Sequence, residues 1–197
     1  MYTEDLEIWL RLKQGDEEAF AVLFEKYHAT LYNYGRKIAP GNPAQVEDAV
    51  QDLFIDLWRL RGGLTDNVQS IRYYLYRSLR RRLANISKAP ELPSEITEAE
   101  ESPESTIMSG ETDKILSEVL QKLIRELPVR QQEALTLRFY EGFSISEVAT
   151  IMQVNEKSVR NFLYKALVQL RRSQSLLVKC GVRLTVLVSI SEQLFFS

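Results

Sequence analysis

The residues from Ser144 to Arg172 constrain the fold of this chain more than any other stretch. Ser144 precedes Glu147 by three positions, which is the spacing of a capping box at the start of a helix. After a short apolar segment, Gln153 and Val154 break the helical pattern, and Asn155 is a favourable N-cap for a second helix. The stretch therefore predicts two helices joined by a tight turn.

The second of these helices has one apolar and one polar face. Its apolar residues recur at helical spacing, which predicts a buried stripe: Val159, Phe162, Leu163, Ala166, Leu167 and Leu170. The opposite face is polar with a net positive charge: Lys157, Arg160, Asn161, Tyr164, Lys165 and Gln169. Such a face on the second helix of a helix-turn-helix suits the DNA major groove, although an ordinary helical hairpin with a solvated face shows the same pattern. DNA binding is the favoured interpretation.

Composition sets limits on how the chain could bind DNA. The sequence has 197 residues, a formal net charge of −2 and a pI of about 5.7, whereas a nucleic-acid-binding domain is usually basic. We therefore expect DNA contacts from local basic patches and a second, acidic surface with a different partner. The length predicts one large domain or two small ones.

The rare residue types argue against an enzyme, a metalloprotein or a membrane protein. Cys180 is the single cysteine and His28 the single histidine, so we expect no internal disulfide, metal site or cofactor. No glycine-rich phosphate loop or catalytic cluster occurs, and we expect no catalytic residue. The acidic N-terminus is not a signal peptide, and no apolar run is long enough for a bilayer. These features fit a cytoplasmic protein.

Two amphipathic helices are predicted in the first part of the chain. Asp16 is the expected N-cap of a helix over Glu17–Ile38, and a break at residues 39–43 separates it from a helix over Ala44–Arg61. The polar face of the second helix carries acidic and amide groups: Glu47, Asp48, Gln51, Asp52 and Asp56. Carboxylates in the first turn suit the helix dipole, but Asp52 and Asp56 lie in mid-helix. An acidic docking surface and a merely solvated face are equally favoured.

A third helix, predicted over Val68–Ile86 after a loop at Gly62–Asn67, is strongly basic. From Ile71 to Lys88 its charged residues are all cationic: Arg72, Arg77, Arg80, Arg81, Arg82 and Lys88. Tyr73, Tyr74 and Tyr76 are interleaved with them. Single-stranded nucleic acid requires cations for its backbone and rings for its unstacked bases. We expect this helix to bind such a strand and at least one tyrosine to belong to the core.

The remaining composition divides the chain into segments. Residues 89–111 contain prolines and glutamates but no Lys or Arg, which predicts a flexible acidic linker. Beyond it we expect a helix capped by Thr112 or Asp113, then another that starts at Pro128 and ends near Tyr140, before the helix-turn-helix. The apolar tail, residues 173–197, fits a helix or a strand equally well and must pack against something or favour aggregation. The predicted fold is all-α: helical domains over 1–88 and 112–172, with the linker between them.

At this point the chain resembles a known family. DAVQDLFIDLW at Asp48–Trp58 resembles the second conserved-region helix of sigma factors of the extracytoplasmic-function (ECF) group, with the pattern D-x-x-Q-[DE]-x-F-x-x-x-W. ELPVRQQEALTLRFYEGFSISEVATIM and NEKSVRNFLYKALVQLRR resemble their C-terminal domain. The resemblance extends from Glu4 to about Arg172, and each half supports the other.

The resemblance implies a role for each surface. Core RNA polymerase would be bound by Asp48, Gln51, Asp52 and Asp56. The minus-ten promoter strand would be opened and held by the loop Gly62–Gln69 and the Arg/Tyr helix, through Asn67, Gln69, Arg72, Tyr73, Arg77, Arg80 and Arg81. The minus-thirty-five duplex would be read by Glu156, Lys157, Ser158, Arg160, Asn161, Tyr164 and Lys165. An anti-sigma factor is a further implied partner, and no small-molecule substrate or membrane insertion is implied.

The chain departs from the family pattern at several positions. Gln153 replaces a frequent Gly, Arg81 replaces a frequent Asn, and Tyr74-Leu75 replaces the usual Trp-Leu pair. A stand-alone regulator with an N-terminal sensor or dimerisation domain is the alternative to a sigma factor. The acidic helix and the Arg/Tyr helix favour the sigma factor, whereas a small-molecule pocket in residues 1–88 would favour the regulator.

Overall fold

The structure is a computed structural model that describes residues 2–39, 41–66, 68, 70–86 and 121–178. Within these ranges every regular element is a helix, so the predicted all-α class is confirmed. The chain divides into two units, residues 1–99 with 149–153 and residues 100–148 with 154–197. The predicted linker, 89–111, lies outside the described residues.

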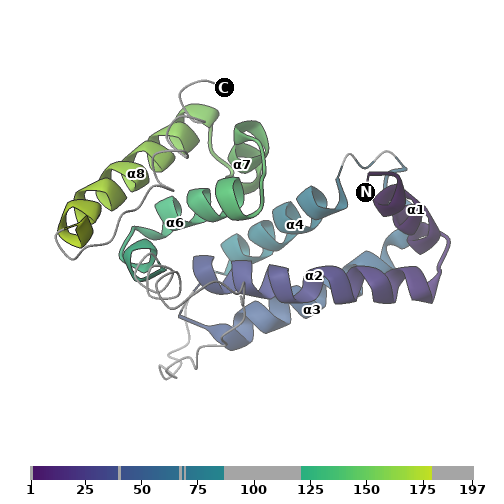
Figure 1. The fold of residues 1–197 in the computed structure, drawn as a ribbon. Helices are drawn as coiled ribbons and strands as arrows, with labels where there is room; N and C mark the ends of the chain where they lie inside the picture. Colours follow the sequence, from purple (N-terminus) through teal and green to yellow (C-terminus); the bar gives the residue numbers. More distant parts are fainter. Residues whose placement is uncertain (1, 40, 67, 69, 87–120, 179–197) are drawn as a thin grey trace. The chain divides into compact units, whose positions relative to one another are not determined.

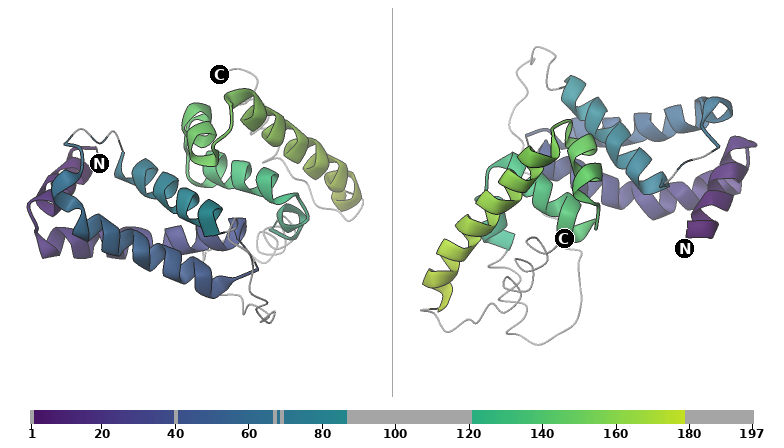
Figure 2. Two further views of the ribbon diagram at one scale, coloured as in Figure 1. Left: turned by 180° about the vertical axis from the view of Figure 1, so that it is seen from behind. Right: turned by 90° about the horizontal axis from the view of Figure 1, so that it is seen from above.

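The first unit is built around three helices that pack against one another. Its elements are α1 (Tyr2–Lys13), α2 (Glu17–Ile38), α3 (Pro43–Arg59), the short 3₁₀ helix η1 (Arg61–Gly63) and α4 (Ile71–Ile86), and Figure 1 labels the four α-helices. Helices α2, α3 and α4 contact one another pairwise, and α1 packs across the beginning of α2 (Figures 1 and 2). The amphipathic patterns explain this arrangement, because each helix must bury its apolar stripe against the others.

Local side-chain caps begin two of these helices. Asp16 accepts hydrogen bonds from the backbone N–H groups of Glu18 and Ala19, which confirms it as the N-cap of α2. Asn42 caps α3 by accepting from the N–H of Gln45, at 3.0 Å. Each cap satisfies amide groups that a helix start leaves without a partner.

The core of the first unit follows the predicted stripes. Its largest fully buried side chains include Trp9, Leu23, Leu31, Tyr34, Phe54, Leu75, Tyr76 and Leu79. Gly35 lies where α2 meets the start of α3, and a Cβ built there would lie 2.5 Å from Cγ1 of Val46. The helices therefore approach closely at a position that only glycine fits.

The second unit contains the predicted helix-turn-helix except for residues 149–153, which the division assigns to the first unit. Residues 121–125 are helical, and they precede α6 (Val129–Leu135), the π-helical turn η2 (Thr136–Tyr140), α7 (Ile145–Met152) and α8 (Glu156–Val178). Pro128 is the N-cap of α6 rather than its first residue. Helix α8 packs along α6 through its apolar stripe, in which Val159, Leu163 and Ala166 are almost completely buried.

Some predicted boundaries were wrong. Helix α1 was not predicted, α3 spans Pro43–Arg59 instead of Ala44–Arg61, and α4 begins at Ile71 instead of Val68. The start of α4 is set by Ser70, whose Oγ accepts a hydrogen bond from the N–H of Tyr73 at 3.2 Å. Helix α8 continues to Val178, six residues beyond the predicted Arg172. The rest of the tail, residues 179–197, lies outside the described residues.

Candidate nucleic-acid and protein interfaces

The helix-turn-helix is formed by local hydrogen bonds that the sequence predicted. The N–H of Ser144 donates to Oε2 of Glu147 at 2.8 Å, and the N–H of Glu147 donates back to Oγ of Ser144 at 3.2 Å. Oδ1 of Asn155 accepts from the N–H of Ser158 at 2.8 Å, which caps α8. Between the helices Gln153 has a φ of 57°, a left-handed conformation that favours glycine. The turn keeps this geometry although Gln replaces the frequent Gly.

The polar face of α8 is open to solvent. Six of the predicted residues are exposed or nearly so: Glu156, Lys157, Arg160, Asn161, Tyr164 and Lys165. The remaining one, Ser158, is half-buried. Arg160 is not isolated, because its Nη2 lies 3.2 Å from Oε2 of Glu156, one turn earlier. An exposed pair of this kind contributes only about 0.3–0.5 kcal/mol, so the guanidinium can exchange that carboxylate for a DNA group.

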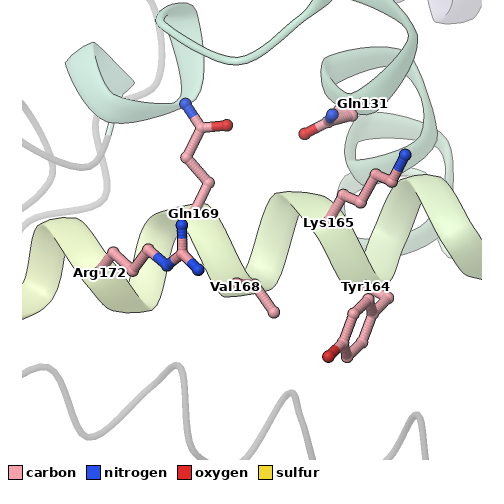
Figure 3. Close-up of a pocket in the computed structure, with 6 residues that line it drawn as sticks. All are labelled: Gln131, Tyr164, Lys165, Val168, Gln169 and Arg172. Atoms are coloured by element: carbon pink, nitrogen blue, oxygen red, sulfur yellow. The ribbon is translucent and has the colours of Figure 1, made fainter.

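A shallow pocket adjoins this face on the side of α6. It has a volume of about 330 Å³ and is lined by Gln131, Tyr164, Lys165, Val168, Gln169 and Arg172. In Figure 3, Lys165 and Gln169 extend from α8 on the side of α6, and Tyr164 extends on the other side. Oε1 of Gln131 is buried, and it accepts no hydrogen bond from any residue that the structure describes. The sequence assigned no role to Gln131 or Arg172, because their proximity depends on how α6 and α8 pack.

Helix α4 separates its tyrosines into different environments. Tyr76 is completely buried and packs against Tyr34 with ring centroids 4.9 Å apart, so it is the tyrosine that belongs to the core. Tyr74 packs edge-on against Trp9 at 5.3 Å. Tyr73 remains half-buried and is one turn before Arg77. Of the three tyrosines, Tyr73 is therefore the one best placed to stack on a base.

The arginines of α4 also divide into two groups. Arg77 and Arg81 are exposed, and Arg72 and Arg80 are half-buried. Arg82 lies on the other flank of the helix, where its Nη2 bonds Oδ2 of Asp56. The sequence shows basic residues along the whole helix, but in the structure Arg82 faces α3 and the other four arginines lie away from it. Two further predicted minus-ten residues, Asn67 and Gln69, lie outside the described residues.

Helix α3 presents most, but not all, of its predicted acidic face. Asp48, Gln51 and Asp52 are exposed. The sequence predicted that Asp56 belongs to this exposed face. In the structure it instead bonds both Arg82 of α4 and Arg59, at 2.8 Å in the second case. These guanidinium groups, Arg82 first, hold the pKa of Asp56 below its usual value. Its position between α3 and α4 makes it a link between the two helices.

Apolar side chains that the sequence analysis had not singled out as contact residues accompany the acidic face. Ile55 is 59% exposed and lies among Asp48, Gln51 and Asp52 on the same side of α3. Phe24 of α2 is 38% exposed and contacts Phe54 with ring centroids 4.9 Å apart. Helical spacing could have identified Ile55, because it is an apolar residue on the otherwise polar face of the helix. The surface thus combines exposed apolar side chains with polar and charged neighbours, and an apolar centre with a polar rim is the usual arrangement of protein–protein interfaces.

The described part of the chain offers no group of three or more histidine, cysteine or carboxylate side chains that could hold a metal ion. Over the same residues, no helix combines the length and the apolar character needed to cross a membrane.

Comparisons with known proteins match both units. The family model "Sigma-70 region 2" matches residues 23–86, and "Sigma-70, region 4" matches residues 117–170. The match to region 2 includes most of α2, α3 and α4, and the match to region 4 includes the helix-turn-helix.

Relatives with the same order of regions occur in several bacteria. The ECF RNA polymerase sigma factor BldN of Streptomyces coelicolor is 29% identical over 175 residues, which cover 85% of this chain and 64% of that protein. The RNA polymerase sigma-H factor of Pseudomonas aeruginosa is 28% identical over 180 residues, covering 83% and 90%. The ECF RNA polymerase sigma-E factor of Escherichia coli is 26% identical over 172 residues, covering 79% and 86%.

Two solved structures share the fold. CnrH, solved in complex with the cytosolic domain of CnrY, has a TM-score of 0.58 at 17% identity and covers 87% of this chain and 97% of its own. RpoE from Bartonella quintana, solved in complex with the anti-sigma factor NepR, has a TM-score of 0.52 at 16% identity, covering 78% and 94%. With regions 2 and 4 matched in this order, and with ECF relatives aligned over both, the chain belongs to the sigma-70 family of RNA polymerase sigma factors, in its ECF group.

Proposed function

We propose that this protein binds core RNA polymerase and directs it to specific promoters, with no catalysis of its own. The observation that carries the proposal is that regions 2 and 4 are both present, each with an exposed face of the required charge. The same matches favour this function over a stand-alone regulator. The protein acts in the cytoplasm, where RNA polymerase transcribes.

Binding to core polymerase is assigned to the outer face of α3. Asp48, Gln51 and Asp52 are exposed and supply the charge, and Ile55 supplies apolar area between them. Complementary charges accelerate association and fix the orientation of the partner, whereas buried apolar groups supply more of the affinity. Asp56 is not assigned a contact with polymerase, because its carboxylate bonds Arg82 and links α3 to α4.

Binding to the minus-ten strand is assigned to the basic face of α4. Arg77 and Arg81 are exposed, with Arg72, Arg80 and Tyr73 half-buried beside them. Cationic groups of this kind neutralise phosphates, and an adjacent ring can stack on an unpaired base. Asn67 and Gln69, in the loop before α4, complete the proposed site from sequence.

Binding to the minus-thirty-five duplex is assigned to the start of α8. Lys157, Arg160 and Asn161 occupy its first two turns, where a recognition helix comes closest to base edges. Glu156, Ser158, Tyr164 and Lys165 complete the proposed set. An anti-sigma factor is the third proposed partner, by analogy with RpoE of Bartonella quintana and its complex with NepR. Neither a small-molecule substrate nor membrane insertion is proposed.

A reconstituted transcription assay tests the proposal. The purified protein is first mixed with immobilised core RNA polymerase from the same organism, and the complex then transcribes genomic fragments to select an active promoter. We expect stable association and run-off transcripts that disappear when the minus-ten or the minus-thirty-five element is scrambled. Tight promoter binding without core association would instead support a stand-alone regulator.

A further inference from the structure

The loop between η1 and α4 is attached to α1 by a single buried indole. Trp9 has no exposed surface, and its Nε1–H donates to the backbone carbonyl of Thr65 at 2.8 Å. The same ring packs edge-on against Tyr74, with centroids 5.3 Å apart and planes at 68°. Since Thr65 lies in the loop and Tyr74 in the first turn of α4, Trp9 contacts both the loop and the helix that follows it.

A second contact from α1 reaches the next loop residue. Nζ of Lys13 bonds Oδ1 of Asp66, and the Lys13 side chain is only 15% exposed although the Asp66 side chain is 81% exposed. Lys13 follows Trp9 by four positions, so both side chains lie on one face of α1. Two adjacent loop residues are thus held by two adjacent turns of the same helix.

The hydrogen bonds of Trp9 and Lys13 are not needed to fill the core. A buried phenylalanine or leucine could fill apolar space, but neither has a polar hydrogen that could be donated to the Thr65 carbonyl, as the indole N–H is. In the second contact the acceptor, Asp66, is exposed, so this bond also ties the loop to α1 without filling the core. Both polar contacts end on the loop, and the far end of the loop is held by the cap that Ser70 provides to α4.

We propose that α1 is a brace for promoter opening: Trp9 and Lys13 are positioning residues that hold Thr65 and Asp66 in the conformation that receives the unpaired minus-ten strand. This inference rests on the assignment of the loop and α4 to that strand. A loop held in its binding conformation before the DNA arrives loses less entropy on binding, which raises affinity without any contact between α1 and DNA.

The test removes the two polar contacts and leaves shape and charge elsewhere intact. Replacement of Trp9 by β-(3-benzothienyl)alanine exchanges the N–H for sulfur in a ring of nearly the same shape. Asp66→Ala removes both the charge and the acceptor of an exposed residue, and Lys13→Asp with Asp66→Lys restores the pair in the opposite sense. Glu7→Gln, an exposed charge change on the same helix, is the matched control.

Holoenzyme made with each variant is measured against a single-stranded minus-ten oligonucleotide, a scrambled oligonucleotide and a minus-thirty-five duplex. We expect the Trp9 replacement and Asp66→Ala each to weaken binding of the minus-ten oligonucleotide by about three- to tenfold, the size expected for one lost hydrogen bond. Core affinity and duplex affinity should match those of Glu7→Gln, and the swapped pair should recover binding.

The possible contrary results are distinct. Unchanged binding of the minus-ten oligonucleotide by both variants would overturn the brace alone. A parallel loss of oligonucleotide, duplex and core binding would also overturn it, since that result indicates a general structural role. Unaltered holoenzyme that does not distinguish the minus-ten oligonucleotide from the scrambled one would overturn the proposed function together with the brace.

Discussion

At the residue scale, the proposed binding of DNA by α8 depends on which of its cationic side chains are exposed. The Arg160 side chain is 53% exposed, and within the described residues its ion-pair partner is Glu156, whose side chain is 49% exposed. Arg160 lies in the second turn of the proposed recognition helix, where a guanidinium can bond two acceptors of a guanine.

Arg160→Ala should weaken binding to the minus-thirty-five duplex by about 1–3 kcal/mol if the side chain bonds a guanine in this way. The measurement is a titration of duplex DNA with holoenzyme, repeated with substituted bases to locate the lost preference. Arg171→Ala, an exposed arginine later in α8, is the control and should have a much smaller effect. Unchanged promoter use by folded Arg160→Ala would contradict the assigned face.

A second residue-scale prediction concerns the contact between α2 and α3. Gly35→Ala should lower the free energy of unfolding by about 1–3 kcal/mol, because overpacking forces neighbouring side chains or helices to move. The added Cβ would meet Cγ1 of Val46 at 2.5 Å, whereas a Cβ at Gly62 would meet no atom within 4 Å. Urea unfolding of Gly35→Ala and Gly62→Ala therefore provides a matched comparison. Equal stability of the two variants would show that the helices can separate at little cost.

At the element scale, α3 combines the proposed polymerase-binding face with an ion pair that links it to α4. The exposed residues Asp48 and Asp52 can change without loss of an intramolecular contact that the structure shows, whereas Asp56 bonds two arginines. Reversing the charge of Asp52 and Asp56 together, the simplest test from sequence, would mix these two effects.

Asp48→Lys with Asp52→Lys should abolish association with core polymerase and leave the unfolding midpoint unchanged, because both side chains are exposed. Co-sedimentation with core polymerase and circular dichroism measure the two properties. Glu7→Lys with Glu25→Lys, two exposed carboxylates on α1 and α2, controls for the change in net charge. Normal holoenzyme assembly by the double variant would mean that the acidic face is only solvated.

The link between α3 and α4 should make stability depend on pH. Because Arg82 lowers the pKa of Asp56 in the folded protein, this carboxylate stabilises the fold above its unfolded pKa. That contribution is lost as the pH falls through the lowered folded pKa, below about 4. Asp56→Asn should therefore be less stable than the original protein at pH 7, with the difference shrinking toward pH 2.

Thermal unfolding across this pH range measures the effect. Arg82→Gln should produce the same change, and the double variant should lose little more than either single one, since both remove one interaction. Additive losses would contradict a shared interaction between Asp56 and Arg82.

At the scale of the whole molecule, a net charge of −2 is poorly suited to binding DNA without a partner. The glutamates of residues 91–104 lie outside the described residues, and their effect remains a prediction from sequence. Their charge acts only within a Debye length of about 8 Å at physiological salt, so it can screen a basic face only when that face is close.

Replacing the linker glutamates by glutamine should raise the affinity of the free protein for promoter DNA, most strongly at low salt. The residues to change are Glu91, Glu95, Glu98, Glu100, Glu101 and Glu104. Fluorescence anisotropy over a range of salt concentrations, without core polymerase, measures this affinity. Glutamine at the five glutamates of α1 and α2, with Glu126→Gln as the sixth change, provides a charge-matched control. Tight and specific binding by the unaltered protein, regardless of linker charge, would contradict the prediction.

The sequence by itself determined where several helices start and which of their faces are apolar. Asp16, the Ser144–Glu147 box and Asn155 were identified correctly because a cap bonds groups two or three residues away. The burial of Val159, Leu163 and Ala166 followed from helical periodicity in the same way. Such contacts are encoded within a single turn of helix and need no knowledge of the rest of the chain.

Only the tertiary structure decided which polar side chains remain available to a partner. Asp56 and Asp52 belong to one predicted face, yet Asp56 bonds Arg82, 26 positions away, and Asp52 is exposed. Tyr76 enters the core while Tyr73 does not, and Trp9 finds its acceptor at Thr65, 56 positions along the chain. Periodicity places a side chain on a face of its own helix, but its partner depends on the angle and register at which another helix packs against that face.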